Sequence, residues 1–432
     1  MLKVWMLLYN LLVVPLLYAG FYTGSLFNGK IGEGRKARKK QFSFLAAEIK
    51  KAGNKKRILF HCSSAGEWLQ AVPLIEKMKS VNEELYMMVS FFSPSGYRFA
   101  RNHTQVDLRF YLPLDSGRAA RKLFNILQPQ LWIISKFDLW PNHVYTASAM
   151  KIPVVITSAT LSADSGRNKG ISKHFNRHIY SLVSHLFPIS EADELRFRQL
   201  VPQTEKYTVA GDTRYDHVYN RWLKADEAGD VEIFSKKKRI TIITGSTWPS
   251  DERHILHPLA DLCNERDDIN LIIVPHELHE SHLADIEKVF ASKQIKTERY
   301  TNFSQKGTSS YNVVIFNTVG LLARLYKQTQ IAFIGGSFGK GTHNVMEPAV
   351  FSQPVLFGPN HLNSYEAMEL LKIGAAFCIN GSEEFRDRVR QLLEDDRLRE
   401  SMGKKARDLI AGNTGATNLI INKLNELYGI IS

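Results

Sequence analysis

Short, uninterrupted apolar runs alternate with segments of helical periodicity along most of this 432-residue chain. Runs that are apolar throughout, such as Pro153-Val154-Val155-Ile156-Thr157, are typical of strands buried on both faces of a parallel sheet. In the first half, the runs predict strands at 57–62, 85–92, 107–112, 131–137, 152–158, 185–189 and 207–210. In the second half, they predict strands at 239–245, 269–275, 312–317, 331–335, 353–358 and 375–379.

A polar, charged stretch at 212–238, which ends in Lys236-Lys237-Lys238, separates the two series of strands. The length suits two domains of ordinary size. We therefore predict an α/β fold of two Rossmann-like domains facing across a cleft. The first domain covers 57–211, and a linker follows at 212–238. The second domain covers 239–432 and includes C-terminal helices.

The N-terminus is uncharged and apolar, since residues 4–29 contain no Lys, Arg, Asp or Glu. About 20 apolar residues can cross a bilayer as a helix, and Trp5 and Tyr22 are residue types common at membrane interfaces. Residues 1–29 are therefore predicted to be a membrane anchor, with a cleaved signal peptide as the alternative. Asn10 and Pro15 leave open a helix that only dips into the inner face.

Most of the net charge of +13 lies directly after this apolar segment. Residues 30–57 hold eleven lysines and arginines against Glu33 and Glu48. Such a run can bind nucleic acid, but beside an apolar helix it favours contact with anionic lipids. By the positive-inside rule it also keeps the following domain cytoplasmic. We predict a basic juxtamembrane segment at 30–56, inner-membrane lipids as partners and no nucleic acid.

Residues 331–348 carry the clearest sign of a ligand site. An apolar strand runs into a turn with four glycines (Gly335, Gly336, Gly339, Gly341), followed by a predicted helix carrying Asn344 and Glu347. Glycines let a backbone approach a ligand, and a helix start offers free N–H groups to a phosphate. The Glu347 carboxylate could accept both hydroxyls of a ribose. The segment therefore predicts a nucleotide site.

Three charged residues follow strands of the first domain. Glu67, in His61-Cys62-Ser63-Ser64-Ala65-Gly66-Glu67-Trp68, is spaced from Ser64 as in a capping box. A carboxylate at a strand end could equally act as a general base. Lys136 ends another strand, and Arg214 lies where the first domain ends and could offset charge on a departing phosphate.

Metal and disulfide sites have weak support. His276, His279 and His282 have helical metal spacing but no evident carboxylate partner, and no Asp-x-Asp motif is present. The three cysteines have neither pairing nor metal spacing, which fits a reducing compartment. We expect no metal and no cofactor.

The ordered motifs resemble one family closely, the 3-deoxy-D-manno-oct-2-ulosonic acid (Kdo) transferases of lipopolysaccharide assembly, which have the GT-B glycosyltransferase fold. Besides His61 to Glu67, the motifs include Ser93 to Tyr97, Leu139-Trp140-Pro141-Asn142, Ala159-Thr160-Leu161-Ser162, Gly211 to Asp216, Gly245-Ser246-Thr247, Gly335-Gly336-Ser337, His343-Asn344, Glu347-Pro348 and Phe357-Gly358-Pro359.

The resemblance implies transfer of Kdo from CMP-Kdo to a lipid A precursor at the inner membrane, without metal and with inversion at the anomeric carbon. Glu67 falls on the family's catalytic base, and Arg214 on a basic position that stabilises the transition state. The family's CMP-contacting positions fall on Pro275, His276, Val319, Gly320, Leu321, Asn344, Val345, Met346 and Glu347.

The chain departs from the family pattern at two of these positions. Lys136 stands where a glutamate is usual, so it cannot act as that glutamate and could instead pair with a phosphate or the Kdo carboxylate. His276 stands where an arginine is usual, which removes bidentate hydrogen bonding to phosphate.

Two other classes of protein remain as alternatives. A GT-B nucleotide-sugar epimerase acting on a soluble sugar would share the domains but would have no use for the anchor. A non-enzymatic membrane or nucleic-acid binder would account for the basic run but not for two domains with polar strand ends.

Overall fold

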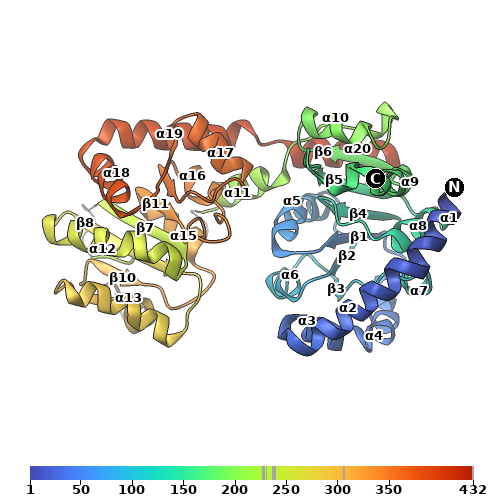
Figure 1. The fold of residues 1–432 in the computed structure, drawn as a ribbon, viewed down its shortest axis with the longest axis horizontal. Coiled ribbons are helices and arrows are strands. Elements are labelled where there is room, and N and C mark those ends of the chain that lie inside the picture. The colour runs from blue at the N-terminus through green and yellow to red at the C-terminus, as the bar shows by residue number, and fades with distance from the viewer. Residues whose placement is uncertain (226–228, 230, 236–239, 305–306, 431–432) are drawn as a thin grey trace. The chain divides into compact units, whose positions relative to one another are not determined.

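The structure is a computed structural model that describes residues 1–225, 229, 231–235, 240–304 and 307–430. The chain forms two compact units (Figure 1). The first domain comprises Met1–His217 together with the chain from Asn413 onward, and the second domain is Val218–Gly412. Each is described here by itself.

The first domain is built on a six-stranded sheet with the order β3-β2-β1-β4-β5-β6. All neighbouring strands are parallel, and Phe60 of the central β1 pairs with Val89 on one side and Ile133 on the other. The strands are β1 (Arg57–Cys62), β2 (Tyr86–Phe91), β3 (Leu108–Tyr111), β4 (Leu131–Ser135), β5 (Val154–Ala159) and β6 (His185–Pro188).

Helices connect the successive strands and cover both faces of this sheet (Figure 1). They are α5 (Ala65–Val81), α6 (Pro94–Phe99), α7 (Gly117–Leu127), α8 (Pro141–Ala149), α9 (Gly170–Ser181) and α10 (Glu191–Arg198), with 3-10 turns η3 (Gly166–Asn168) and η4 (Thr204–Lys206).

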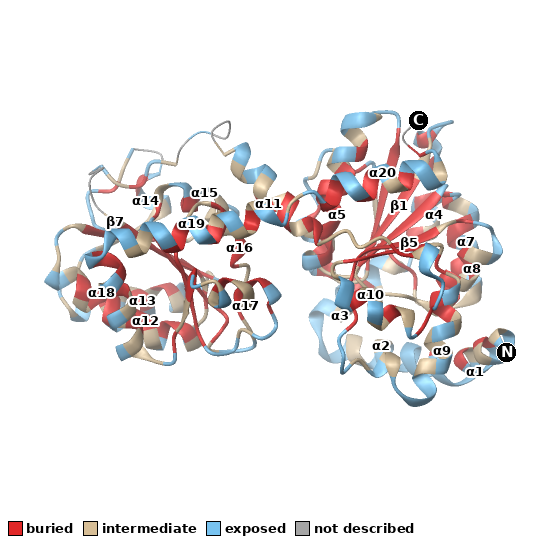
Figure 2. Ribbon diagram, turned by 90° about the horizontal axis from the view of Figure 1, so that it is seen from above, coloured by how far each residue is buried: buried red, intermediate tan, exposed pale blue. Residues whose placement is uncertain are grey.

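Strand residues of the first domain alternate between two buried cores, one on each face of the sheet. Ile58 and Phe60 pack in one core and Leu59 in the other. This is why the strand segments are apolar at every position rather than at every second one. In Figure 2 the strands of both domains are buried, whereas the outer faces of the helices are exposed.

The second domain repeats the same topology. Its seven-stranded sheet has the order β13-β12-β11-β7-β8-β10-β9, again with parallel neighbours. The strands are β7 (Ile240–Thr247), β8 (Ile269–Pro275), β9 (Thr297–Arg299), β10 (Val313–Ile315), β11 (Ile331–Ile334), β12 (Val355–Phe357) and β13 (Ala376–Cys378).

The helices of the second domain lie between these strands and after the last of them. They are α12 (Pro249–Glu265), α13 (Glu280–Ser292), α14 (Tyr300–Phe303), α15 (Leu322–Leu325), η5 (Tyr326–Gln328), α16 (Met346–Val350), α17 (Tyr365–Lys372), α18 (Ser382–Glu394) and α19 (Asp396–Gly412). Apart from the edge strand β9, both sheets have the strand order of a Rossmann fold. The prediction of two Rossmann-like domains is confirmed.

The N-terminal segment is helical and packs on the first domain. It forms α1 (Leu2–Leu8), the π-helical turn η1 (Tyr9–Val13), α2 (Val14–Phe27), α3 (Gly29–Arg38), α4 (Gln41–Glu48) and η2 (Ile49–Ala52). By its length and composition, the helix from Leu2 to Phe27 could cross a membrane. Met6 and Leu45 join the core beneath them.

The expected domain boundaries need two corrections. Residues 213–223, expected in a linker, form the helix α11 (Thr213–Leu223), while Lys236-Lys237-Lys238 lie outside the described residues. The helix α20 (Ala416–Tyr428), expected in the second domain, packs against α5 of the first. Its Ile420 and Leu424 are buried in the core that α5 shares with β1, so burial of this apolar face decides where the helix belongs.

One expected strand is not formed, and one strand of the structure was not expected. Residues 207–210 were expected to form a strand, but they make only one bridge, Leu186 with Tyr207, and two further backbone hydrogen bonds to β6. Conversely, β9 was not expected, because Thr-Glu-Arg has no apolar run. Its place at the sheet edge leaves these side chains half-buried, so no such run is needed.

The packing of α20 predicts different costs for two leucines on the same helix. Leu424→Ala should lower the free energy of unfolding by about 2–5 kcal/mol, because it opens a cavity beneath a fully buried side chain. Leu427→Ala, the matched control at a position 40% exposed, should change it little. Denaturant unfolding of the full chain measures both, and equal effects would contradict the assignment of α20 to the first domain.

Candidate active site

In the first sheet the strand order reverses between β1 and β4, and such a switch point is where open α/β sheets bind ligands. A buried hydrogen-bonded chain connects these two strands. The His61 Nδ1 lies 2.9 Å from Ser90 Oγ, and its Nε2 lies 3.1 Å from Asp138 Oδ2. Burial acts to raise the pKa of Asp138, but hydrogen bonds from His61 and Trp140 outweigh it and hold the pKa below its usual range. The hydrogen bond between His61 of β1 and the Asp138 carboxylate after β4 therefore links the carboxyl ends of these two strands.

Glu67 lies directly after β1, in the first turn of α5. The Ser64 N–H donates to Glu67 Oε2 at 2.8 Å, and the Ser63 hydroxyl donates to the same oxygen at 2.6 Å. The capping box expected from the spacing is confirmed. Within the described part of the chain, Glu67 Oε1 accepts no hydrogen bond, so one oxygen of this nearly buried carboxylate remains available to take a proton.

Arg214 is tied to the helix that carries Glu67. Its Nη2 donates to Asp212 Oδ2 at 2.7 Å, and Gln70 on α5 donates to the same oxygen at 3.1 Å. Burial acts to raise the pKa of Asp212, but the Arg214 charge and hydrogen bonds outweigh it and hold this pKa below its usual range. Tertiary structure thus ties Arg214, through Asp212 and Gln70, to the helix whose first turn carries Glu67.

Lys136 follows β4 with an unusual backbone. Its φ is +71°, a left-handed conformation that is uncommon for a residue with a side chain. The Lys136 N–H donates to the Thr157 carbonyl at 2.8 Å, and its ammonium lies 5.3 Å from the Phe137 ring centroid. Ser158, at the end of β5, is left-handed as well, with φ +48°. Such conformations cluster at functional sites, and here both lie at the same edge of the sheet.

The second domain brings the expected CMP-contacting positions to one sheet edge. Pro275 ends β8 and His276 follows it, 319–321 follow β10, and 344–347 follow β11. With β7 these strands are neighbours in the order β11-β7-β8-β10, so their carboxyl ends lie side by side. Val345 and Met346 are both only 1% exposed, which leaves their backbone rather than their side chains for a ligand.

His276 is part of a stack of three rings at this edge. Its ring lies 4.4 Å from that of Trp248 and 4.8 Å from that of His343, with small interplanar angles. The Trp248 Nε1–H donates to His343 Nε2 at 3.0 Å. Burial, and then the neighbouring His276, lower the pKa of His343. Trp248 and His343 were not among the expected site residues, because nothing in their local sequence signals the stacking.

The glycine-rich turn differs from the expectation. Its glycines were expected to let the backbone approach a ligand, but the Asp251 carboxylate lies there and accepts hydrogen bonds from the Gly336 and Phe338 N–H groups, at 2.8 and 3.0 Å. The Asp251 carboxylate therefore occupies the position that the phosphate of a ligand would take at these N–H groups. Gly335 is required by packing, because a Cβ there would lie 2.4 Å from the Ser246 carbonyl oxygen.

The helix after this turn also starts later than expected. It was expected to carry Asn344, but α16 begins at Met346 and has five residues. Asn344 precedes it, and its Oδ1 accepts the Met346 N–H at 3.1 Å, as in an Asx turn. Because the helix is so short, its dipole offers little to a phosphate. Glu347 lies in its first turn.

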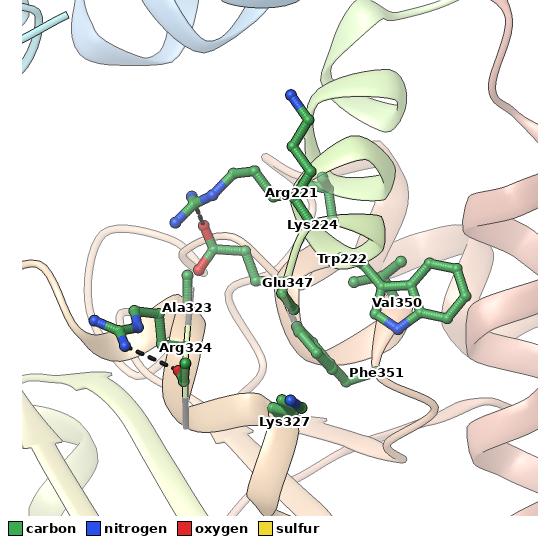
Figure 3. A pocket seen from close by; sticks show the side chains of 12 residues that line it. Arg221, Trp222, Lys224, Ala323, Arg324, Lys327, Glu347, Val350 and Phe351 are labelled. Carbon is green, nitrogen blue, oxygen red and sulfur yellow. Dashed lines mark hydrogen bonds and ion pairs between the residues drawn. The ribbon is translucent and has the colours of Figure 1, made fainter. Parts of the chain in front are cut away.

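The Glu347 carboxylate lines a pocket of about 250 Å³ within the second domain (Figure 3). The walls also include α11 and the segment α15–η5, with Trp222 and Phe351 among the apolar residues and several cations. Burial raises the pKa of Glu347, an effect opposed by Arg221, whose Nη1 lies 3.4 Å from Glu347 Oε1. In the described part of the chain, no group of three or more His, Cys, Asp or Glu residues could hold a metal ion.

Comparison with known proteins shows which family the chain resembles. Residues 36–217 match the family model described as 3-deoxy-D-manno-octulosonic-acid transferase (kdotransferase). The 3-deoxy-D-manno-octulosonic acid transferase of Haemophilus influenzae is 28% identical over 85% of this chain and 86% of that protein. The corresponding transferase of Chlamydophila psittaci is 28% identical over 74% of each. Residues 36–217 thus carry the Kdo transferase domain, and most of the chain is similar to Kdo transferases. The chain is therefore a glycosyltransferase.

Solved structures agree on the fold of this transferase. A UDP-GlcNAc 2-epimerase from Neisseria meningitidis, bound to UDP-GlcNAc, matches with a TM-score of 0.60 and 15% identity, over 86% of this chain and 100% of that chain. MurG of Acinetobacter baumannii matches with a TM-score of 0.53 and 12% identity, over 86% and 100%. At such identities the likeness concerns the fold alone, and it confirms the GT-B expectation.

The ion pair between the buried Asp212 and Arg214 predicts a pH-dependent stability of the transferase. Because the pKa of Asp212 is lowered on folding, its charge stabilises the native state above about pH 4 and ceases to do so as pH falls through the native pKa. Asp212→Asn should therefore destabilise the protein at pH 7 by about 1–3 kcal/mol. The difference from wild type should shrink toward pH 3, and urea unfolding at both pH values measures it. A difference independent of pH would contradict this assignment.

Proposed function

We propose that this glycosyltransferase moves Kdo from CMP-Kdo to a lipid A precursor of the lipid IVA type, in lipopolysaccharide core biosynthesis. The transfer inverts the anomeric carbon and needs no metal. The observation that carries the proposal is Glu67, which lies at the carboxyl end of β1 with one carboxylate oxygen unused, inside the segment matched by the family model.

In the proposed reaction, Glu67 acts as general base. Its free Oε1 takes the proton of an acceptor hydroxyl while the hydroxyl oxygen attacks the anomeric carbon of Kdo. The bond from that carbon to the CMP phosphate breaks on the opposite face, so the configuration inverts and CMP leaves. The Ser63 and Ser64 hydrogen bonds to Oε2 fix the carboxylate and keep Oε1 in place.

Cations of the protein offset the charge that develops on the departing phosphate. Arg214 has this role in the proposal, and its Asp212 partner holds the guanidinium in one orientation. The Lys136 ammonium makes no ion pair within the described part of the chain, and its strained backbone fixes it at a sheet edge. We assign it to the carboxylate of Kdo, in place of the glutamate role it cannot fill.

The donor nucleotide binds at the edge of the second sheet. Glu347 accepts the ribose hydroxyls, and the backbone of Asn344, Val345 and Met346 lies beside it at the same strand end. The polar groups of Pro275, His276 and residues 319–321 complete the CMP site. With His276 in place of arginine, the phosphate meets an aromatic ring stack rather than a guanidinium.

The transfer assay tests this proposal directly. The purified chain, incubated with CMP-Kdo and a lipid A precursor, should release CMP and add Kdo to the lipid, as mass spectrometry detects. Glu67→Gln should lower the turnover number by about 10²–10⁴-fold, because an amide cannot accept the proton.

The glutamine variant is matched to the capping box, because Gln at this position can still bond the N-cap N–H. Its thermal stability and CMP affinity should therefore stay near those of wild type. Near-normal turnover in Glu67→Gln would leave Glu67 with the capping role alone. Release of free sugar without an acceptor would instead favour an epimerase or hydrolase.

We also propose that the N-terminal helix attaches the enzyme to the cytoplasmic face of the inner membrane while lying along the first domain. Polar side chains of the helix bond to that domain: the Tyr9 hydroxyl donates to Asp115 at 2.8 Å and Asn10 Nδ2 to Asn142 Oδ1 at 3.0 Å. Its other side is apolar and exposed, with Leu11 at 63% and Leu16 at 73%. A helix bonded to the domain along one side suits insertion in the plane of the interface.

This attachment predicts that exposed helix residues control lipid binding. Leu16→Glu should weaken binding to vesicles with anionic lipids, because a charge must then enter the apolar region. Leu195→Glu, at a position 62% exposed in α10, serves as control and should leave binding unchanged. Vesicle co-sedimentation measures both, and equal binding of all three proteins would refute the attachment.

A further inference from the structure

The expected ribose contact, Glu347, lies in surroundings that disfavour its charge. Its side chain is 20% exposed, and Val350 and Phe351 form apolar walls beside it (Figure 3). The hydroxyl of the fully buried Tyr326 is close enough that the Glu347 charge contributes to raising the pKa of this phenol. Such surroundings favour the protonated form of a carboxylate, and a nearby cation opposes that effect.

Arg221, in the last turn of α11, supplies that partner. Its Nη1 lies 3.4 Å from Glu347 Oε1, and Figure 3 shows its guanidinium pointing toward the carboxylate. The pair joins residues 126 positions apart in the sequence. The Asn344 side chain, in the loop before α16, acts in the same direction as Arg221 on the pKa of Glu347.

We propose that Arg221 is a positioning residue for the donor nucleotide: it keeps the Glu347 carboxylate ionised and oriented to accept the vicinal hydroxyls of a ribose. The inference rests on the proposed function, in which Glu347 binds the ribose of CMP. A charged carboxylate can accept two hydroxyl hydrogen bonds at once, whereas a protonated one must use an oxygen as donor. Arg221 therefore acts on ribose recognition through Glu347.

Other ionisable groups also face the pocket. They are Lys224, which directly follows α11, and Arg324 and Lys327 on α15–η5. Of the cations, only Arg221 lies within salt-bridge distance of Glu347 in the described part of the chain. An effect of the pocket's overall positive charge can therefore be distinguished from an effect of the specific Arg221–Glu347 pair by substituting Lys224.

The test measures the affinities of CMP and 2′-deoxy-CMP by calorimetry, from about pH 5 to about pH 8. Arg221→Gln should reduce the preference for CMP over 2′-deoxy-CMP by about tenfold at neutral pH, the value of a hydrogen bond to a charged group. Because Arg221 lowers the pKa of Glu347, its loss should also move the acid-side decline of CMP affinity to higher pH. Arg221→Lys keeps the positive charge, so it should retain most of the preference for CMP and most of the wild-type pH profile.

Lys224→Gln is the matched control, because it removes a cation three residues from Arg221 in the same pocket without changing either residue of the ion pair. It should leave the ribose preference and the pH profile as in wild type. Glu347→Gln should abolish the preference for CMP over 2′-deoxy-CMP. Adding Arg221→Gln to this variant should lower the CMP affinity little further. The titration of the CMP phosphate is common to all variants and cancels in these comparisons.

The outcomes separate this inference from the function beneath it. An unchanged ribose preference and pH profile in Arg221→Gln, with CMP binding and sugar transfer intact in wild type, would overturn the positioning role alone. Equal changes of the ribose preference and the pH profile in Lys224→Gln would also overturn the positioning role, and would indicate a general effect of positive charge in the pocket. Failure of wild type to bind CMP would overturn the proposed function itself.

Discussion

The order of parallel strands is the constraint on which this enzyme depends. In each sheet the chain winds outward from a central strand in one direction and then in the other, so the connections diverge between β1 and β4 and between β7 and β11. Every strand leaves the sheet at the same edge because all neighbours are parallel. Glu67, Lys136, His276 and Glu347 therefore gather at such edges, although long helices separate them along the chain.

Several groups at these edges serve structure and chemistry together. Glu67 closes a capping box with one oxygen and keeps the other for a proton, so the structural and catalytic interpretations are compatible. In the second domain, Asp251 fastens the glycine-rich turn through two of its N–H groups, which turns an expected anion site into an internal bond. In the proposed function, recognition of the nucleotide therefore depends more on Glu347 and the ring stack than on free backbone amides.

The fold was largely predictable because burial on both faces makes each central strand apolar throughout. Twelve of the thirteen strands of the described structure coincide with such runs. The exception, β9, lies at an edge where half-buried polar residues suffice. Helix α20 was assigned to the wrong domain because an amphipathic face shows that a helix packs, not which surface receives it.

The candidate site was predictable only in part. Motifs located Glu67, Arg214 and Glu347, but the partners that tune these groups come from distant segments: Gln70 and Asp212 for Arg214, and Arg221 for Glu347. No local pattern marks such pairs.

By itself, the sequence determined the two Rossmann-like domains, the apolar N-terminal helix and the positions of the charged residues, because periodicity and strand–turn boundaries are local properties. Tertiary structure alone decided which oxygen of Glu67 is free, that Asp251 occupies the turn, and that Arg221 opposes the effect of burial on Glu347. These depend on hydrogen bonds and charges brought together from distant parts of the chain, and such contacts exist only once the sheets have formed.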